Sequence, residues 1–157
     1  MHYDHRKVQI VLALRSIGVT DTTVMAAMEA IPRELFVPPS LKRHAYEATA
    51  LPIGYEQTLS QPGIVGIMTQ ALSLTDRLKV LEVGTGSGYQ TVVLARLSRR
   101  VYTIERHKPL LRNAEARFKK LSLSNITTKW GDGTMGWVEQ TPFDRIIVTA
   151  AALDVPP

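Results

Sequence analysis

The segment LEVGTGSGYQTVVLA, residues 81–95, decides the class of fold. An apolar run ends at Val83, a helical pattern follows, and between them three glycines alternate with small polar residues, at Gly84, Gly86 and Gly88. Glycine adopts positive φ and has no Cβ, so a ligand can approach the backbone closely at this junction. The spacing is not the G-x-G-x-x-G of dinucleotide enzymes, and no Gly-Lys-Ser/Thr follows, so a phosphate group is not the favoured ligand.

Beyond residue 75, strand patterns alternate with helix patterns. Buried apolar runs predict strands within 77–84, 100–106, 125–130 and 144–149, and helical spacing predicts helices within 88–98 and 108–121. This alternation is typical of right-handed crossovers and of a parallel sheet covered on both faces. We therefore predict an α/β, doubly wound, Rossmann-like fold.

The N-terminal part predicts helices instead. Apolar residues at helical spacing indicate a helix over 6–17 and a second one that Thr20 or Asp21 can cap and that Pro32 stops. A short helix is expected over 40–48. Pro62 can open a longer helix, with an inward face made of Ile64, Val65, Ile67, Met68, Ala71 and Leu72.

The intervening segment LPIGYEQTLSQPG, residues 51–63, is rich in turn residues and is expected to be a long loop. The chain then divides into an N-terminal helical subregion with an active-site loop, residues 1–75, and an α/β core, residues 76–157. Its length suits one domain overall.

Acidic residues follow the predicted strands. Glu82 lies just before the glycine loop, where a negative charge would oppose a pyrophosphate and suit a cation. Glu105 ends the next strand, where an acid can accept both ribose hydroxyls of a nucleoside. Asp132, in the turn 131–133 after the third strand, can accept a hydrogen bond from an adenine amino group. Together these residues predict a site for an adenosine with a positive, non-phosphate tail, which is S-adenosylmethionine.

Each of these features alone has a simpler interpretation. The glycine loop can be a tight turn, Glu105 a solvated strand end, and Asp132 an ordinary turn residue. Only their joint occurrence after three consecutive strands favours the cofactor site.

The composition bounds the function. The 157 residues are 45% hydrophobic and 21% charged, which suits a packed core, and the absence of cysteine fits a reducing, cytoplasmic location. The net charge is +5, but the basic residues are dispersed, so no nucleic-acid partner is expected. No apolar run approaches the roughly 20 residues of a membrane span. His2, His5 and His44 show no metal-ligand spacing, and no metal is expected.

Several segments resemble one enzyme family, the protein-L-isoaspartate O-methyltransferases of the class I S-adenosylmethionine-dependent superfamily. They are IPRELFVPP (31–39), LPIGYEQTLSQPGIVGIMTQAL (51–72), VLEVGTGSGYQTVVLARL (80–97), GDGTMGW (131–137) and PFDRIIVTAAALDVP (142–156). The glycine motif is shared by many methyltransferases, whereas its combination with QTLSQP is much more specific.

The resemblance implies an activity. The family transfers a methyl group from S-adenosylmethionine to the free α-carboxylate of L-isoaspartyl residues in damaged proteins and peptides, and S-adenosylhomocysteine is the other product. The ester then cyclises to a succinimide without the enzyme. By motif, Ser60 takes the active-site serine position. The cofactor positions implied are Gln57, Thr58 and Leu59 beside it, and Glu82, Gly84, Gly86, Glu105, Asp132 and Gly133.

This reaction needs no strong general base from the protein. A carboxylate is already ionised at pH 7, and a sulfonium methyl is already activated, so alignment and removal of water remain. We expect the Ser60 hydroxyl to orient the substrate carboxylate and not to act as a nucleophile. The alternative is that Ser60 caps the helix opened by Pro62.

In the family, further strands follow the fourth strand, residues 144–149. Here we expect this strand to be a bare apolar edge, through which the protein can self-associate. The functional alternatives are another class I methyltransferase and a truncated, non-catalytic fragment that binds S-adenosylmethionine.

Overall fold

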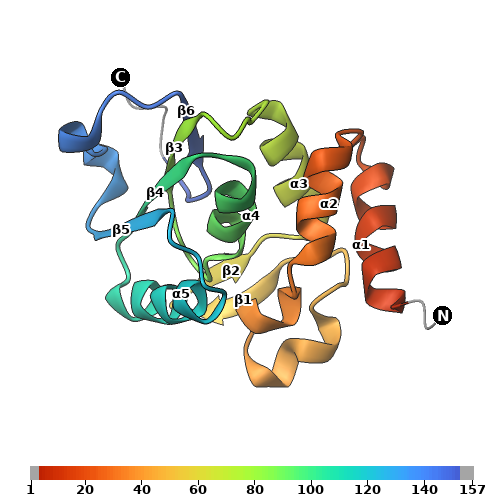
Figure 1. Cartoon of the computed structure of the whole chain (residues 1–157). Coiled ribbons are helices and arrows are strands. Elements are labelled where there is room, and N and C mark those ends of the chain that lie inside the picture. Colours follow the sequence, from red (N-terminus) through yellow and green to blue (C-terminus); the bar gives the residue numbers. More distant parts are fainter. Residues whose placement is uncertain (1–3, 153–157) are drawn as a thin grey trace. The chain divides into compact units, whose positions relative to one another are not determined.

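A computed structural model describes residues 4–152, which fall into two compact units, one within residues 1–74 and one within residues 75–157 (Figure 1). His2 and the end of the quoted segment 142–156 lie outside the described residues. Within 4–152, no helix has both the length and the apolar character that crossing a membrane requires.

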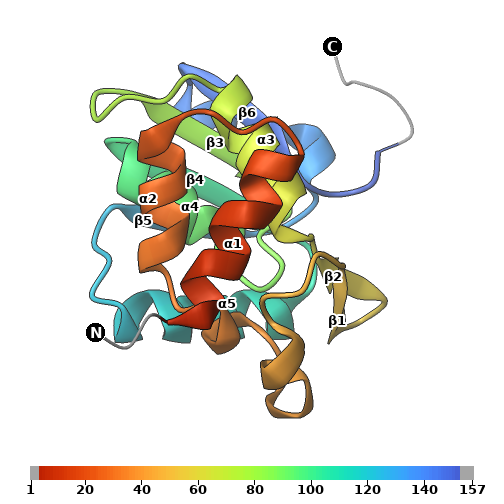
Figure 2. The same ribbon diagram turned by 90° about the vertical axis from the view of Figure 1, so that its right-hand side faces the viewer.

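Three helices pack together in the first unit (Figure 2): α1 (His5–Ser16), α2 (Thr22–Ala30) and α3 (Pro62–Ala71). The sequence allows either Thr20 or Asp21 as the cap of α2, and the structure shows which one it is. The Asp21 carboxylate accepts hydrogen bonds from the main-chain N–H groups of Thr23 and Val24, so Asp21 is the N-cap of α2. Pro62 stands in the first turn of α3, as predicted.

The inward face of α3 differs from the prediction. Of the six residues expected to point inward, only Val65 is buried, and the buried face consists of Pro62, Gly63, Val65, Gly66 and Thr69. The reason is a close approach to α1: a Cβ on Gly66 would lie 2.3 Å from Leu14 Cδ2. Small residues therefore face α1, and the larger apolar residues turn aside.

The prediction of a long loop over 51–63 is wrong. Strand β1 (Leu51–Gly54) pairs with β2 (Gln57–Leu59) in an antiparallel hairpin. The two turn residues, Tyr55 and Glu56, have φ of 54° and 57°, so both are left-handed, as a type I′ turn requires. Asn-Gly usually marks such turns in a sequence, but here Tyr55 and Glu56 occupy the two turn positions.

Two short 3₁₀ helices, Arg33–Phe36 and Pro39–His44, precede the hairpin. The second replaces the helix expected over 40–48 and ends at His44, which is followed by turn and bend conformations.

The second unit contains a four-stranded sheet in which every described pair is parallel. Strands β3 (Lys79–Val83), β4 (Arg100–Glu105), β5 (Ile126–Trp130) and β6 (Arg145–Val148) lie in the order β5-β4-β3-β6. Helix α4 (Tyr89–Leu97) connects β3 to β4, and α5 (Lys108–Lys120) connects β4 to β5 (Figure 1). The predicted doubly wound, parallel α/β fold is therefore confirmed.

Each face of the sheet is partly covered within this unit. Helices α4 and α5 pack against β4 and β5. On the other face, Leu81, Tyr102 and Ile104 form a buried cluster that is joined by Trp137 and Phe143 from the connection between β5 and β6. The Tyr102 and Trp137 rings meet edge to face, with centroids 5.4 Å apart.

Strand β6 forms one edge of the sheet within the described residues. Ile147 is 4% exposed, whereas its neighbours Ile146 and Val148 are 58% and 41% exposed. Strand β6 is therefore an edge strand within the described residues, as predicted, and its exposed apolar side chains lie on the sheet face that also carries Leu81 and Val83.

Candidate functional site

The glycine loop connects β3 to α4 and has the backbone that its sequence predicted. Gly84, Gly86 and Gly88 all have positive φ, at 102°, 53° and 89°. The N–H of Gly84 donates to Ile104 O of the neighbouring strand over 2.9 Å, so the loop is attached to β4 as soon as it leaves β3. At Gly84, a Cβ would stand 3.0 Å from the Cβ of Ala150, so a larger residue would be crowded as well as strained.

Glu105, at the end of β4, fixes the middle of this loop. Its Oε2 accepts a hydrogen bond from the Gly86 N–H at 2.8 Å, and its Oε1 accepts one from the His107 N–H at 2.9 Å. The side chain is 6% exposed. A carboxylate has about four lone-pair positions, so each oxygen can still accept a hydroxyl. The geometry adds a loop-holding role to the ribose contact that the sequence predicted.

Glu82, in β3, is fully buried. Its Oε2 accepts hydrogen bonds from the hydroxyls of Thr91 at 2.5 Å and Thr103 at 2.8 Å. Thr103 Oγ1 also lies 2.6 Å from Thr85 Oγ1 in the glycine loop, so a polar chain runs from the loop through β4 to Glu82 and α4.

The burial of Glu82 changes its charge. The pKa of Glu82 is raised to about 8, mainly by desolvation; the hydrogen bonds from Thr91 and Thr103 offset part of this effect, and the negative charge of Glu105 adds a smaller upward contribution. The carboxyl group is therefore mostly neutral at pH 7. This corrects the expectation of a negative charge beside the loop, which assumed an ionised Glu82.

The turn after β5 places Asp132 and Gly133. Asp132 is exposed, and its Oδ1 accepts hydrogen bonds from the N–H and hydroxyl groups of Thr134, at 3.0 and 2.9 Å. The main-chain hydrogen bond from Thr134 is the largest cause of a lowered pKa of Asp132, so this residue is an ionised acceptor. Gly133 lies against β3, since a Cβ there would be 2.2 Å from Val83 Cγ1.

Three bends thus meet at the carboxyl ends of β3, β4 and β5. Glu105 holds Gly86 through its side chain and accepts from the Gly131 N–H at 3.0 Å through its main-chain oxygen. Gly133, in the bend after β5, packs closely against the Val83 side chain at the end of β3. The sequence predicted a role for the glycines and acids of these bends but none for Thr85, Thr91 and Thr103, because a single threonine in a loop, helix or strand carries no recognisable signal.

Ser60 belongs to the first unit and lies between β2 and α3. The N-cap of α3 is Gln61, and no side chain caps this helix, so the capping alternative for Ser60 is not observed. Within residues 4–152 the Ser60 hydroxyl makes no hydrogen bond, whereas its carbonyl oxygen accepts one from Arg33 Nη2 at 2.6 Å. The half-buried hydroxyl is thus available to a ligand.

Ser60 also lines a pocket of about 330 Å³ in this unit. The lining combines hydroxyl, amide and small apolar groups, from Ala48, Thr49, Ala50, Thr58, Ser60, Gln61 and Ile64. Of the other predicted loop residues, Thr58 also lines this pocket, whereas Gln57 and Leu59 have other surroundings. Gln57 donates from its side-chain amide to Tyr55 O in the hairpin turn, and the Leu59 side chain is buried. The site roles of Gln57, Thr58 and Leu59 stay predictions.

A doubly wound parallel sheet with a glycine loop after one strand and an acid at the end of the next is typical of nucleoside-binding folds, among them the class I methyltransferases. Comparison with known proteins supports this class. The structure resembles a solved protein-L-isoaspartate O-methyltransferase with a TM-score of 0.84 and 29% identity, over 96% of this chain and 50% of that one. A Plasmodium falciparum structure described under the same enzyme name, in complex with S-adenosyl-L-homocysteine, matches in fold with a TM-score of 0.81 and 24% identity, over 96% and 76% of the two chains.

Sequence comparison defines the family. Residues 5–157 match the family model of protein-L-isoaspartate(D-aspartate) O-methyltransferase. The protein-L-isoaspartate O-methyltransferases of Paramagnetospirillum magneticum and Rhodospirillum rubrum are each 60% identical to this chain, over 97% and 99% of it and 71% and 72% of their own lengths. The chain belongs to the protein-L-isoaspartate(D-aspartate) O-methyltransferase family. The predicted family and enzyme class are confirmed.

Proposed function

We propose that this protein transfers a methyl group from S-adenosylmethionine to the free α-carboxylate of L-isoaspartyl residues in damaged proteins and peptides. The family match over residues 5–157 is the observation that supports this substrate class. It does not favour the alternative of a non-catalytic fragment, and it replaces the general class I alternative with one family.

The cofactor is assigned to the bends of the second unit. Gly84 and Gly86 let the amino-acid part of S-adenosylmethionine approach the backbone, Glu105 accepts the ribose hydroxyls, and Asp132 accepts from the adenine amino group. Supporting this assignment, Asp132 is exposed and its Oδ2 makes no hydrogen bond within residues 4–152. Glu82 does not touch the cofactor but supports the glycine loop through its hydrogen bond with Thr103. Gly133 lets the turn after β5 pack closely against β3.

The reaction is a displacement at the methyl carbon. A substrate carboxylate oxygen forms the new bond to the methyl group while the sulfur–methyl bond breaks, which leaves a neutral thioether and requires no proton transfer. The Ser60 hydroxyl donates a hydrogen bond to the other carboxylate oxygen and so fixes the line of approach. Correct alignment at about 3 Å supplies most of what such a reaction needs.

The macromolecular substrates of this protein are isoaspartyl proteins and peptides and not nucleic acid, which the dispersed basic residues support. A second copy of the chain can pair with β6, whose Ile146 and Val148 are exposed. A cytoplasmic location is supported by the absence of cysteine.

The test combines calorimetry with S-adenosylmethionine and a methyl-transfer assay on an isoaspartyl peptide. The control is the same peptide with a normal aspartyl linkage. We expect micromolar cofactor binding and methylation of the isoaspartyl peptide alone. Binding without transfer would select the non-catalytic alternative, and transfer only to other acceptors would select another class I methyltransferase.

A further inference from the structure

Arg33 is a charged side chain with 0% exposure in the first unit. It opens the short 3₁₀ helix Arg33–Phe36. Removing a guanidinium from water is costly unless its N–H groups find acceptors. Two of them do so on main-chain carbonyls: Nε donates to Ala45 O and Nη2 donates to Ser60 O, each at 2.6 Å.

The contact with Ser60 fixes the peptide unit that follows this serine. Ser60 lies between the last residue of β2 and Gln61, the N-cap of α3. Its carbonyl oxygen accepts from Arg33, and its hydroxyl makes no hydrogen bond within residues 4–152. Because the guanidinium is a rigid planar fork, its two carbonyl contacts hold the Ser60 peptide plane at a set distance and angle from Ala45.

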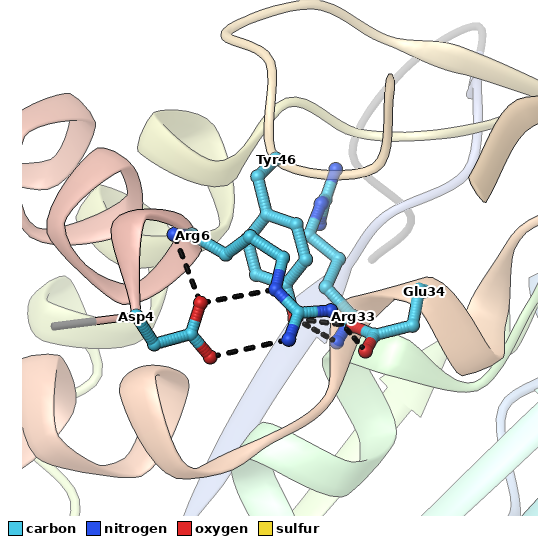
Figure 3. Close-up of polar contacts among 5 residues, drawn as sticks. All are labelled: Asp4, Arg6, Arg33, Glu34 and Tyr46. Atoms are coloured by element: carbon cyan, nitrogen blue, oxygen red, sulfur yellow. Dashed lines mark hydrogen bonds and ion pairs between the residues drawn. The ribbon is translucent and has the colours of Figure 1, made fainter. Parts of the chain in front are cut away.

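Arg33 is itself held by a polar network, which Figure 3 shows. The Arg33 main-chain N–H donates to the Tyr46 hydroxyl at 3.1 Å, and this hydroxyl donates to Glu34 Oε2. Glu34 Oε1 accepts from Arg6 Nη1 at 3.1 Å. The 3₁₀ helix is thereby tied both to α1 and to the segment that carries Ala45.

Tyr46 keeps its proton in this network. Burial, followed by the hydrogen bond to Glu34, raises the pKa of Tyr46. The phenol therefore donates to Glu34 and accepts from the Arg33 N–H throughout the pH range in which the protein would work.

We propose that Arg33, anchored by Tyr46 and Glu34, is a positioning residue that sets the direction of the Ser60 hydroxyl toward the substrate carboxylate. The inference rests on the proposed function, because it assigns Arg33 an effect only through Ser60. Arg33 does not touch the substrate, and the geometry of the Ser60 peptide unit transmits its effect.

The decisive experiment is a double-mutant cycle on the full chain with Arg33→Lys and Ser60→Ala. Lysine keeps the charge but loses the planar fork, so kcat for an isoaspartyl peptide should fall about 10- to 100-fold, the cost of a small misplacement in a reacting complex. The fold-change in kcat should be larger than the fold-change in KM. Combined with Ser60→Ala, the arginine substitution should cost no more than about 2-fold further.

Arg43→Lys is the matched control, because Arg43 is exposed on the 3₁₀ helix Pro39–His44 and should leave kcat unchanged. A merely structural Arg33 would give the same loss of kcat with and without Ser60, and that result would overturn the inference while the proposed function stands. Wild-type kcat in Ser60→Ala would instead remove the serine from the mechanism, and this inference with it.

If Arg33→Lys does not fold, as judged by circular dichroism and thermal melting, Tyr46→Phe enters the same cycle. It removes the hydroxyl that accepts from the Arg33 N–H and donates to Glu34, so Arg33 is held less firmly and kcat should fall about 2- to 10-fold. This loss should disappear in the Ser60→Ala background. Wild-type kcat in folded Tyr46→Phe would overturn the proposal.

Discussion

Gly86 donates its main-chain N–H to Oε2 of Glu105 across 2.8 Å, so the acid at the end of β4 holds the glycine loop at the end of β3. The other oxygen, Oε1, holds the His107 N–H at the start of α5. The loop is therefore shaped before any ligand arrives, and a nucleoside that binds there does not have to order it. Such preorganisation lowers the entropic cost of binding.

Substitution of Glu105 by glutamine should weaken cofactor binding. A glutamine must direct its NH₂ group at either the Gly86 or the His107 N–H, so one donor faces another donor and a buried hydrogen bond is lost. Such a loss costs about 1–3 kcal/mol, which corresponds to roughly 5- to 150-fold in the Kd for S-adenosylmethionine measured by calorimetry. Glu115→Gln, on the exposed side of α5, is the control and should bind as wild type. Equal affinities of the two variants would show that Glu105 holds neither loop nor ligand.

Gly133→Ala should destabilise the second unit, because the new Cβ would lie 2.2 Å from Val83 Cγ1. Overpacking of this kind costs about 1–3 kcal/mol in the free energy of unfolding. Gly131→Ala is a close control two residues away, since a Cβ there meets nothing within 4 Å. Chemical denaturation should separate the two variants, and Val83→Ala should partly rescue Gly133→Ala. A Gly133→Ala protein as stable as Gly131→Ala would mean that the turn after β5 is free to move away from β3.

The sequence was sufficient to predict the sheet of the second unit. Strands β3, β4 and β6 are apolar runs long enough for one strand each; Gly84 follows β3 and Glu105 ends β4, which marks where the chain bends. These signals are local, so they are visible without the structure. The hairpin β1–β2 was missed because Tyr55 and Glu56 adopt left-handed backbone conformations that neither residue type favours.

The remaining differences depend on contacts between distant segments. The side of α3 that carries Gly66 is buried because it packs closely against Leu14, although the bulky residues elsewhere on the helix form the stronger apolar pattern. Arg33 stands in a proline-rich stretch that marks a break in helical structure, and only folding brings the carbonyl groups of Ala45 and Ser60 to it. Glu82 likewise has an ordinary sequence context, and its charge is decided by burial.

Ser60→Ala should lower the rate of methyl transfer without unfolding the protein. The Ser60 hydroxyl makes no hydrogen bond within residues 4–152, so its loss leaves no partner unsatisfied, and the melting temperature should change little. Loss of one charge-assisted hydrogen bond to the substrate carboxylate should reduce kcat/KM about 10- to 100-fold. Thr49→Ala, in the same pocket, is the control and should have a smaller effect. Kinetics with an isoaspartyl peptide that match wild type would exclude the serine from the reaction.

Glu82→Gln should flatten the dependence of stability on pH. The pKa of Glu82 is about 8 in the folded protein against a reference of 4.5, so between these values the unfolded chain has lost a proton that the folded protein retains. Stability from this group is therefore fully present below about pH 4.5 and is lost as the pH rises toward 8, by at most about 5 kcal/mol. Glutamine does not titrate, so the difference in melting temperature, variant minus wild type, should increase steadily from pH 5 to pH 8.

Glu139→Gln, on an exposed 3₁₀ turn, provides the comparison and should follow the wild-type curve across the same range. All other titrating groups are common to the proteins, so they cancel in the difference between Glu82→Gln and wild type. A constant difference from pH 5 to pH 8 would show that Glu82 is ionised throughout. In that case the carboxylate would carry a buried charge beside Thr103, and the glycine loop would face the negative group that its sequence first indicated.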